Sequence, residues 1–312
     1  MRARARAWAE LLRVSALFTV PGDALAGASA AGLRPNRGTA LAVGASLCLY
    51  QAGMALNDWS DRAEDAVDRP ERPIPSGRIT PGAALTAATV LTAAGLALAA
   101  RAGRPALTVA TALAATVWSY DLRLKHTKAA PATMAAARTL DLLMGATATA
   151  THTAPGTGRS AVTGAMTPPT GAAAATPERV ARAAPAALLL GAHTYAVTAV
   201  SRHEVHGGST LAPLGALGTV LAIGATAARD GRPVPTALGA AYVRAAAVPY
   251  AHAALNPSPA LTRRAVGGGI RAVIPLQAAL AARARGSGNV VGIGLLTLVP
   301  IARKLARKVS PT

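Results

Sequence analysis

Acidic side chains crowd into one short segment that directly follows a long apolar run. The segment begins at residue 57 and reads NDWSDRAEDAVDRPERPIPSGRI. It holds six of the 13 acidic residues in the chain. Asn57, Asp61 and Asp65 recur every four residues, and Asp58 precedes Asp61 by three, so oxygen ligands would stack along one helical face. Like charges at this spacing repel unless cations share the site. Mg²⁺ takes carboxylate and phosphate oxygens and keeps waters, so the pattern predicts a Mg²⁺ site completed by phosphate.

The end of this segment combines prolines with arginines. RPERPIPSG, from Arg69 to Gly77, places three prolines within six residues and therefore cannot remain helical. A stiff loop that folds back would bring Arg69 and Arg72 beside the carboxylates, where guanidinium groups bind phosphate oxygens. The alternative is a solvated loop of mixed charge that only connects two helices.

The surrounding chain has the composition of a membrane protein. Of its 312 residues, 52% are hydrophobic and 14% are charged, against about 25% charged in soluble domains. Apolar runs of roughly 18 residues or more recur, enough to cross about 30 Å of hydrocarbon. We expect an all-α, polytopic membrane bundle formed by a single domain, 1–312. The expected spans are 12–33, 39–57, 82–101, 104–120, 131–150, 181–200, 209–228, 235–255 and a region from about 266.

The C-terminal region decides the number of spans. It holds either one helix with a broken approach, 267–285 and then 289–303, or two short helices. We predict about nine spans, with ten as the alternative. The basic tail that runs from Arg303 to Lys308 agrees better with ten.

Basic residues indicate the orientation of the chain. The formal net charge is +19, but the bases sit in short loops between apolar runs, which argues against binding of nucleic acid. The N-terminus, the loops 58–81, 121–130 and 201–208, and Arg263-Arg264 fall on one side. That side is predicted to be cytoplasmic. The excess of Arg and Ala indicates a GC-rich bacterial genome, and hence a bacterial cell membrane.

The N-terminus and residues 151–180 differ in composition from the other segments. The N-terminus imitates a secretory signal peptide, but Arg13 interrupts its apolar run and Pro21 precedes any plausible cleavage point. We expect an uncleaved first span preceded by a short amphipathic lead-in that contains Trp8 and Leu11. Residues 151–180 are rich in Thr, Ala, Pro and Gly, which is typical of a flexible extramembrane loop.

The acidic motif resembles the first Asp-rich motif of the UbiA superfamily of intramembrane prenyltransferases. The shared pattern is NDxxDxxxDxxRPxRPIPSG, and the apolar pattern is similar over nearly the whole chain. YDLRLK, from Tyr120 through Arg123 to Lys125, is similar to the tyrosine–lysine element of the family. The resemblance implies about nine helices around a central cavity, with the Asp-rich segments at its cytoplasmic mouth. It also implies that Asn57, Asp58, Asp61 and Asp65 hold Mg²⁺ and diphosphate, which Arg72 and Lys125 neutralise.

The second Asp-rich motif departs from the family pattern. In place of a DxxxD element, the chain reads SRHEVHGG from Ser201 and offers one acid, Glu204, beside three potential cations. Either Glu204 binds a second Mg²⁺ alone, or Arg202 replaces that ion as a fixed charge; a capping loop without catalytic function is the third reading. The departure resembles a divergent, EboC-like branch of UbiA-like proteins, with which TVPGDALAG in the first span is also shared.

Further polar residues fall within the expected spans, where charge is costly and usually faces a cavity. Asp23 lies in the first span. Arg138 and Asp141 are three residues apart in the fifth span and could pair across one turn, as a structural ion pair or as part of a substrate site. Four aromatic candidates for an acceptor pocket, although such residues more often only pack, are His193, Tyr195, Tyr250 and His252.

These observations favour one activity over its rivals. An allylic diphosphate would ionise, an unidentified acceptor would attack the carbocation, and Mg²⁺ with Arg72 and Lys125 would stabilise the leaving diphosphate. An apolar cavity would exclude water, and the prenyl chain would enter from the lipid bilayer. A membrane terpene cyclase, or a non-catalytic isoprenoid-binding or transport protein, remains an alternative because the second motif is degenerate. The DxxDGxxAR pattern of CDP-alcohol phosphotransferases is absent.

Overall fold

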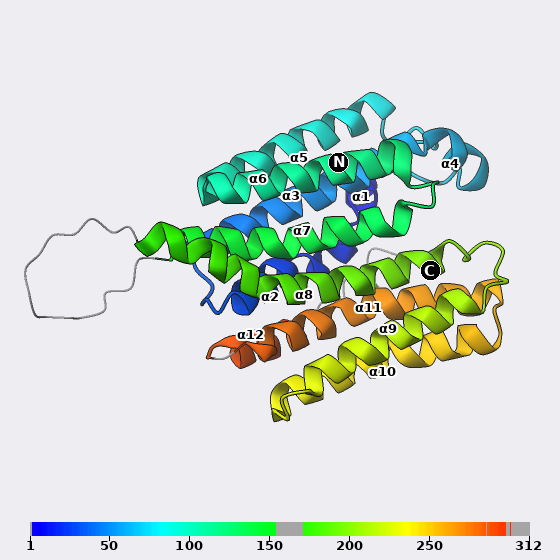
Figure 1. Ribbon diagram of the computed structural model, residues 1–312. Helices are drawn as coiled ribbons and strands as arrows, with labels where there is room; N and C mark the ends of the chain where they lie inside the picture. Colours follow the sequence, from blue (N-terminus) through cyan, green and yellow to red (C-terminus); the bar gives the residue numbers. More distant parts are fainter. Residues whose placement is uncertain (1, 154–170, 285, 298–299, 301–312) are drawn as a thin grey trace, which may run out of the picture.

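The protein is a bundle of long helices that run roughly side by side (Figure 1). The computed structural model describes residues 2–153, 171–284, 286–297 and 300, and every regular element in them is helical. The elements are α1 (Arg2–Leu11), η1 (Val14–Thr19), α2 (Pro21–Ala30), α3 (Arg37–Ser60), α4 (Arg62–Asp68), α5 (Pro81–Ala102), α6 (Arg104–Ser119), η2 (Tyr120–Leu124), α7 (Ala130–Thr151), α8 (Gly171–Ser201), α9 (Leu211–Ala228), α10 (Pro233–Leu255), α11 (Pro259–Arg283) and α12 (Gly288–Leu296).

Six segments of the described chain are helical, long and apolar enough to cross a membrane. They are Arg4–Ala30, Arg37–Ser60, Pro81–Ala102, Pro177–Ser201, Leu211–Ala228 and Pro259–Arg283. The expectation of an all-α membrane bundle is therefore confirmed, whereas the count of nine spans stays a prediction.

Capping residues explain where several helices begin. The Asn36 side chain accepts hydrogen bonds from the backbone of Gly38 at 2.9 Å and Thr39 at 3.2 Å, and Thr39 Oγ1 accepts one from the Asn36 N–H. This reciprocal capping box satisfies donors that the first turn of α3 leaves free. Thr80 and Ser258 cap α5 and α11 by accepting one backbone hydrogen bond each, and proline follows each at the first helical position.

The expected first span is broken, contrary to the prediction of one helix over 12–33. Arg13 adopts a left-handed conformation, φ 46° and ψ 49°, and a 3₁₀ segment separates it from α2. This backbone region is strained for a residue other than glycine. The predicted lead-in is present, since Trp8 and Leu11 of α1 pack in a cluster with Leu56 and Ile79. The break turns the Arg13 side chain towards the carboxylates described below.

Two further boundaries differ from the sequence prediction. α11 begins at Pro259, so Arg263 and Arg264 lie in a helix and not in a loop, and the nine-residue α12 is too short to span a bilayer. α8 begins at Gly171, so the last part of the expected loop 151–180 is helical. Residues 154–170 and the tail 301–312 lie outside the described residues.

Several polar connections lie at the α4 end of the bundle, while the α9–α10 connection, 229–232, lies at the other end (Figure 1). The turn between α6 and α7, the loop after α8 and the turn between α10 and α11 all lie at the α4 end. The loops that the charge pattern assigned to one side therefore do share one side.

Closely packed glycines join α2 to α7. A Cβ atom on Gly145 would lie 2.3 Å from the Ala24 Cα, and one on Gly27 would lie 2.1 Å from the Leu142 carbonyl oxygen. Small residues allow such backbone contact between helices in lipid. The contact fixes the position of α2, which carries Asp23, against α7, which carries Arg138.

Gly145→Ala is expected to lower the free energy of unfolding by about 1–3 kcal/mol, because the added methyl group overlaps the backbone of α2. The matched control is Gly218→Ala on α9, where a Cβ would meet nothing within 4 Å. The control should be neutral or stabilised by up to about 1 kcal/mol, since alanine favours helices. SDS titration followed by circular dichroism measures both. Equal stabilities of the two variants would contradict this account of the α2–α7 contact.

Candidate functional site

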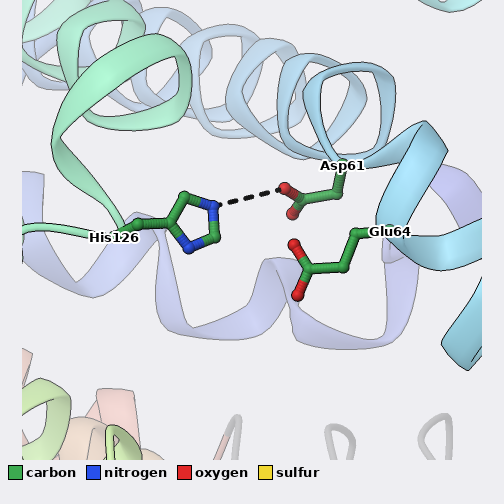
Figure 2. Close-up of side chains that lie close together, drawn as sticks. All are labelled: Asp61, Glu64 and His126. Atoms are coloured by element: carbon green, nitrogen blue, oxygen red, sulfur yellow. Dashed lines mark ion pairs between the residues drawn. The ribbon is translucent and has the colours of Figure 1, made fainter.

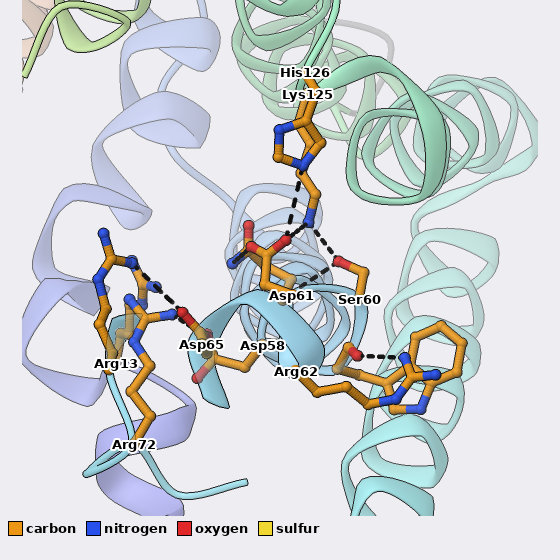
Figure 3. Close-up of polar contacts among 12 residues, drawn as sticks. Arg13, Asp58, Ser60, Asp61, Arg62, Asp65, Arg72, Lys125 and His126 are labelled. Carbon is orange, nitrogen blue, oxygen red and sulfur yellow. Dashed lines mark hydrogen bonds and ion pairs between the residues drawn. The ribbon is translucent and has the colours of Figure 1, made fainter. Parts of the chain in front are cut away.

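Asp61 stands at the point where α3 ends, and basic residues from another part of the chain meet it there (Figure 3). Lys125, which follows η2, forms an ion pair with Asp61, and its Nζ donates to Ser60 Oγ at 2.5 Å. Asn57 Nδ2 donates to Asp61 Oδ2 at 3.1 Å, so the two residues lie on consecutive turns as their spacing predicts. The pair is largely buried, with 10% of the Lys125 side chain and 18% of the Asp61 side chain exposed.

Asp58 and Asp65 pair with arginines and not with Lys125. Arg72 Nη1 lies 2.7 Å from Asp65 Oδ2 and 3.5 Å from Asp58 Oδ1, and Arg69 Nη1 lies 3.6 Å from Asp65. Arg13 Nη2 approaches Asp58 at 3.5 Å. The proline-rich loop therefore folds back and brings Arg69 and Arg72 to the carboxylates, as the sequence predicted.

The acidic residues do not form one continuous row. Asp61 has non-helical dihedrals at the junction of α3 and α4, so the chain turns between Asn57 and Asp65. Figure 3 shows Lys125 approaching Asp61 from one side, with Arg13 and Arg72 on the other. The prediction that Asn57, Asp61 and Asp65 share one helical face was therefore wrong for Asp65.

One group of side chains has the spacing of a metal site. Oxygen atoms of Asp61 and Glu64 and a nitrogen of His126 lie within 4.8 Å of one another. The three side chains point towards a common space in Figure 2. Two carboxylates suit Mg²⁺, which accepts oxygen ligands and waters, whereas imidazole suits transition metals better. The oxygen donors therefore fit Mg²⁺, with His126 at the edge of the group.

A cavity of about 300 Å³ opens beside these residues, between α3, α6 and α7. Its outer end is polar and is lined by Arg13, Asn57, Tyr120 and Asp121. Its walls are apolar, and its inner end is polar again. The wall residues include Leu49, Met54, Leu113, Val117 and Met134, and the inner end holds Ser46, Tyr50, Arg138 and Asp141.

The degenerate second motif reaches the same end of the bundle. Arg202 donates a hydrogen bond to the backbone carbonyl of Thr127, two residues after Lys125. Burial raises the pKa of Glu204, while the charges of Arg263 and Arg69 lower it. Among the described residues Glu204 makes no ion pair.

Arg123 is exposed and makes no ion pair within the described part of the chain, whereas Tyr120, Asp121 and Lys125 of the YDLRLK element lie at the site. The π-helical turn of η2, from Tyr120 to Leu124, accounts for this difference. Such turns are frequent at functional sites, and this one lets Tyr120 and Asp121 line the cavity while Lys125 meets Asp61.

Arg138 pairs with a different carboxylate from the one predicted. Its Nε lies 3.0 Å from Asp23 Oδ2, and Asp141 instead accepts a hydrogen bond from Ser46. Gln277 of α11 donates to Asp23 at 2.6 Å. The cause is the close α2–α7 contact, which brings Asp23 to the Arg138 guanidinium.

The four aromatic candidates do not line the cavity. His193 accepts a hydrogen bond from the Tyr242 hydroxyl at 2.9 Å and donates one to the Gly269 carbonyl at 3.1 Å, so it is a buried packing residue. Tyr250 is buried elsewhere, and both Tyr195 and His252 are exposed. Their part in an acceptor pocket finds no support in this cavity and stays a prediction.

Several site residues escaped the sequence analysis. Arg13, Ser46, Tyr50 and Asp121 line the cavity, and Glu64 and His126 lie at the candidate metal group. Arg13 carried a signal, since a cation in an apolar run usually faces a cavity. Tyr50 carried none, because an aromatic residue in a span ordinarily packs.

The chain is similar to known proteins in sequence and in fold. The sequence profile described as the UbiA prenyltransferase family matches residues 15–255. Digeranylgeranylglyceryl phosphate synthase of Methanopyrus kandleri is 37% identical over 127 residues, which cover 39% of this chain and 45% of that protein. The match thus spans less than half the length of this curated relative.

Solved structures share the fold. One described as digeranylgeranylglyceryl phosphate synthase in membranes superposes with a TM-score of 0.60 at 15% identity, covering 96% of this chain and 100% of the other. A UbiA homologue from Archaeoglobus fulgidus, bound to GPP and Mg²⁺, has a TM-score of 0.52 at 15% identity and covers 97% of this chain and 99% of the other. At these identities the likeness concerns the fold alone.

Arg72→Met is expected to lower the free energy of unfolding by about 1–3 kcal/mol, because it leaves the buried Asp65 carboxylate without its 2.7 Å partner. Arg78→Met is the control, since the Arg78–Glu10 pair has 38% and 41% of its side chains exposed. That pair should contribute less than about 1 kcal/mol. SDS titration measures both, and adding Asp65→Asn to Arg72→Met should restore part of the loss. Equal losses in the two single variants would contradict the burial argument.

Proposed function

Because the chain belongs to the UbiA prenyltransferase family, we propose that it is a Mg²⁺-dependent intramembrane prenyltransferase. It transfers an isoprenoid chain from an allylic diphosphate to a small or lipophilic acceptor. One observation carries the proposal: carboxylates and cations interleave at the outer end of an apolar-walled cavity. The Archaeoglobus homologue with GPP and Mg²⁺, and the Methanopyrus relative named as a synthase, support it.

The carboxylates of this site would hold the metal. Asp61 and Glu64 have the closest oxygen donors, Asn57 adds an amide next to Asp61, and Asp58 and Asp65 lie one turn away. Mg²⁺, when bound, stabilises negative charge that develops on the leaving diphosphate.

The cations of the site bind the diphosphate. In this structure Lys125 is paired with Asp61 and Arg72 with Asp65, so each cation already lies where a phosphate oxygen would compete for it. Diphosphate then takes the place of the carboxylates as the partner of the cations. Lys125 and Arg72, assisted by Arg13 and Arg69, neutralise the leaving group as the bond to the allylic carbon breaks.

The cavity protects and directs the carbocation. Its apolar walls hold the isoprenoid chain and exclude water, which would otherwise quench the cation. The acceptor attacks the allylic carbon and loses its proton, and diphosphate leaves with the bonding electron pair.

In this proposal the Arg202 guanidinium takes the place of a second Mg²⁺ ion. Its hydrogen bond to the Thr127 carbonyl holds it beside the segment that carries Lys125, which favours the fixed-charge reading over a Mg²⁺ ion bound by Glu204. Glu204 then interacts electrostatically with Arg69 and Arg263 and does not act as a metal ligand.

The site faces the cytoplasm of a bacterial cell in this proposal. The loops at the site end are basic, and basic loops are retained on the cytoplasmic side of a membrane.

Asp61→Asn is expected to lower Mg²⁺-dependent release of diphosphate from a labelled allylic diphosphate on the order of 10²-fold, because the substitution removes a metal ligand and the partner of Lys125. Asp68→Asn is the matched control, since Asp68 is exposed on the adjoining α4 and makes no ion pair among the described residues. The control should retain activity within about threefold.

Mass spectrometry of the products extends this test. A prenylated acceptor supports transfer, whereas an isoprenoid product formed without any second substrate would indicate a cyclase instead. Unchanged diphosphate release by Asp61→Asn would contradict the proposed site.

A further inference from the structure

The inner end of the cavity is polar although it lies deep in the bundle. Ser46, Tyr50, Arg138 and Asp141, here called the inner polar cluster, line it. Ser46 precedes Asn57 by 11 residues on the same helix, which corresponds to roughly 16 Å at 1.5 Å per residue. Ser46 is therefore remote from the metal and diphosphate site, whereas Tyr50, seven residues before Asn57, lies between the two polar ends.

Two buried acids face one basic residue around this cluster. Asp23 is fully buried and Asp141 is 7% exposed, and the basic residue nearest to both is Arg138. Arg138 is engaged by Asp23 at 3.0 Å and by the Thr19 carbonyl at 3.4 Å, and Gln277 adds a neutral donor to Asp23. Asp141 is held by the neutral Ser46 hydroxyl and faces the cavity. Two carboxylates thus share one guanidinium.

We propose that the inner polar cluster binds the polar head of the acceptor and selects a neutral or cationic head that donates hydrogen bonds. The inference rests on the proposed function, which it deepens by naming the class of acceptor. Acceptors that present a carboxylate or a phosphate to this end of the cavity are excluded.

Electrostatics provide the reason for this selection. An anionic head would find the guanidinium of the cluster already engaged by Asp23, in surroundings where unpaired charge is costly. A hydroxyl or ammonium head would instead donate to Asp141. The Tyr50 hydroxyl, which also lines the cavity, can serve either as donor or as acceptor.

The size of the cavity agrees with this assignment. A volume of about 300 Å³ lies at the small end of ordinary ligand pockets. The separation of the two polar ends places the head of a small acceptor against Asp141 and leaves its nucleophile directed towards the allylic carbon.

Equilibrium dialysis of the full chain in lipid nanodiscs tests the selection with three labelled phenols of similar size. The probes are 4-hydroxybenzyl alcohol, which is neutral, tyramine, which is cationic, and 4-hydroxybenzoate, which is anionic. The neutral and cationic probes should bind at least tenfold more tightly than the anion. Asp141→Asn should reduce this preference to threefold or less, because it removes one negative charge, whereas the surface control Asp68→Asn should leave it unchanged.

The wild-type comparison decides by itself if Asp141→Asn fails to fold. Equal or tighter binding of 4-hydroxybenzoate, or no preference among the three probes, overturns the inference. Mg²⁺-dependent binding of a labelled allylic diphosphate, measured on the same preparation, distinguishes failure of the proposed function from failure of this inference. Loss of that binding counts against the proposed function, while its presence with the wrong selectivity counts against the inner polar cluster alone.

Discussion

The arrangement of the site depends on the need to compensate buried negative charge where α3 meets α4. Asp58 and Asp65 are 5% and 3% exposed, and carboxylates in such surroundings require cations. Three segments far apart in sequence supply them: the break after α1 through Arg13, the proline-rich loop through Arg72, and the turn after α6 through Lys125. Each supplying segment has an irregular backbone. The left-handed Arg13, the proline-rich turn after α4 and the π-helical η2 all occur where a cation must reach a carboxylate.

Local sequence patterns predicted the parts of the structure that local physics determines. Apolar runs located most of the long helices, and the prolines from Pro70 to Pro75 forced the loop that returns Arg72 to Asp65. Tertiary contacts decided the remainder. The pairing of Arg138 with Asp23 depends on glycines that let α2 approach α7, and nothing in the spacing of Arg138 and Asp141 signals it. Likewise, the four-residue period predicted Asn57 beside Asp61 but could not reveal that the helix ends there and sends Asp65 elsewhere.

The two polar ends of the cavity have different charge balances, and they therefore favour different ligands. The outer end combines several carboxylates with Arg13, Arg72 and Lys125, so it can exchange internal ion pairs for a metal ion and a diphosphate. The inner end offers Asp141 beside a guanidinium that is already engaged, so it favours hydrogen-bond donors. An isoprenoid chain suits the apolar walls between them. A degenerate second acidic motif is compatible with this division, because Arg202 adds positive charge at the outer end.

Partner exchange at the outer end is the central claim, and its most direct test is the binding of a non-ionising allylic thiolodiphosphate by isothermal titration, with Mg²⁺ and with EDTA. Without the metal, the carboxylates retain Lys125 and Arg72 and repel the ligand, so the account predicts affinity at least tenfold tighter with Mg²⁺. Equal affinity under both conditions would contradict it, because the carboxylates would then have no part in binding the diphosphate.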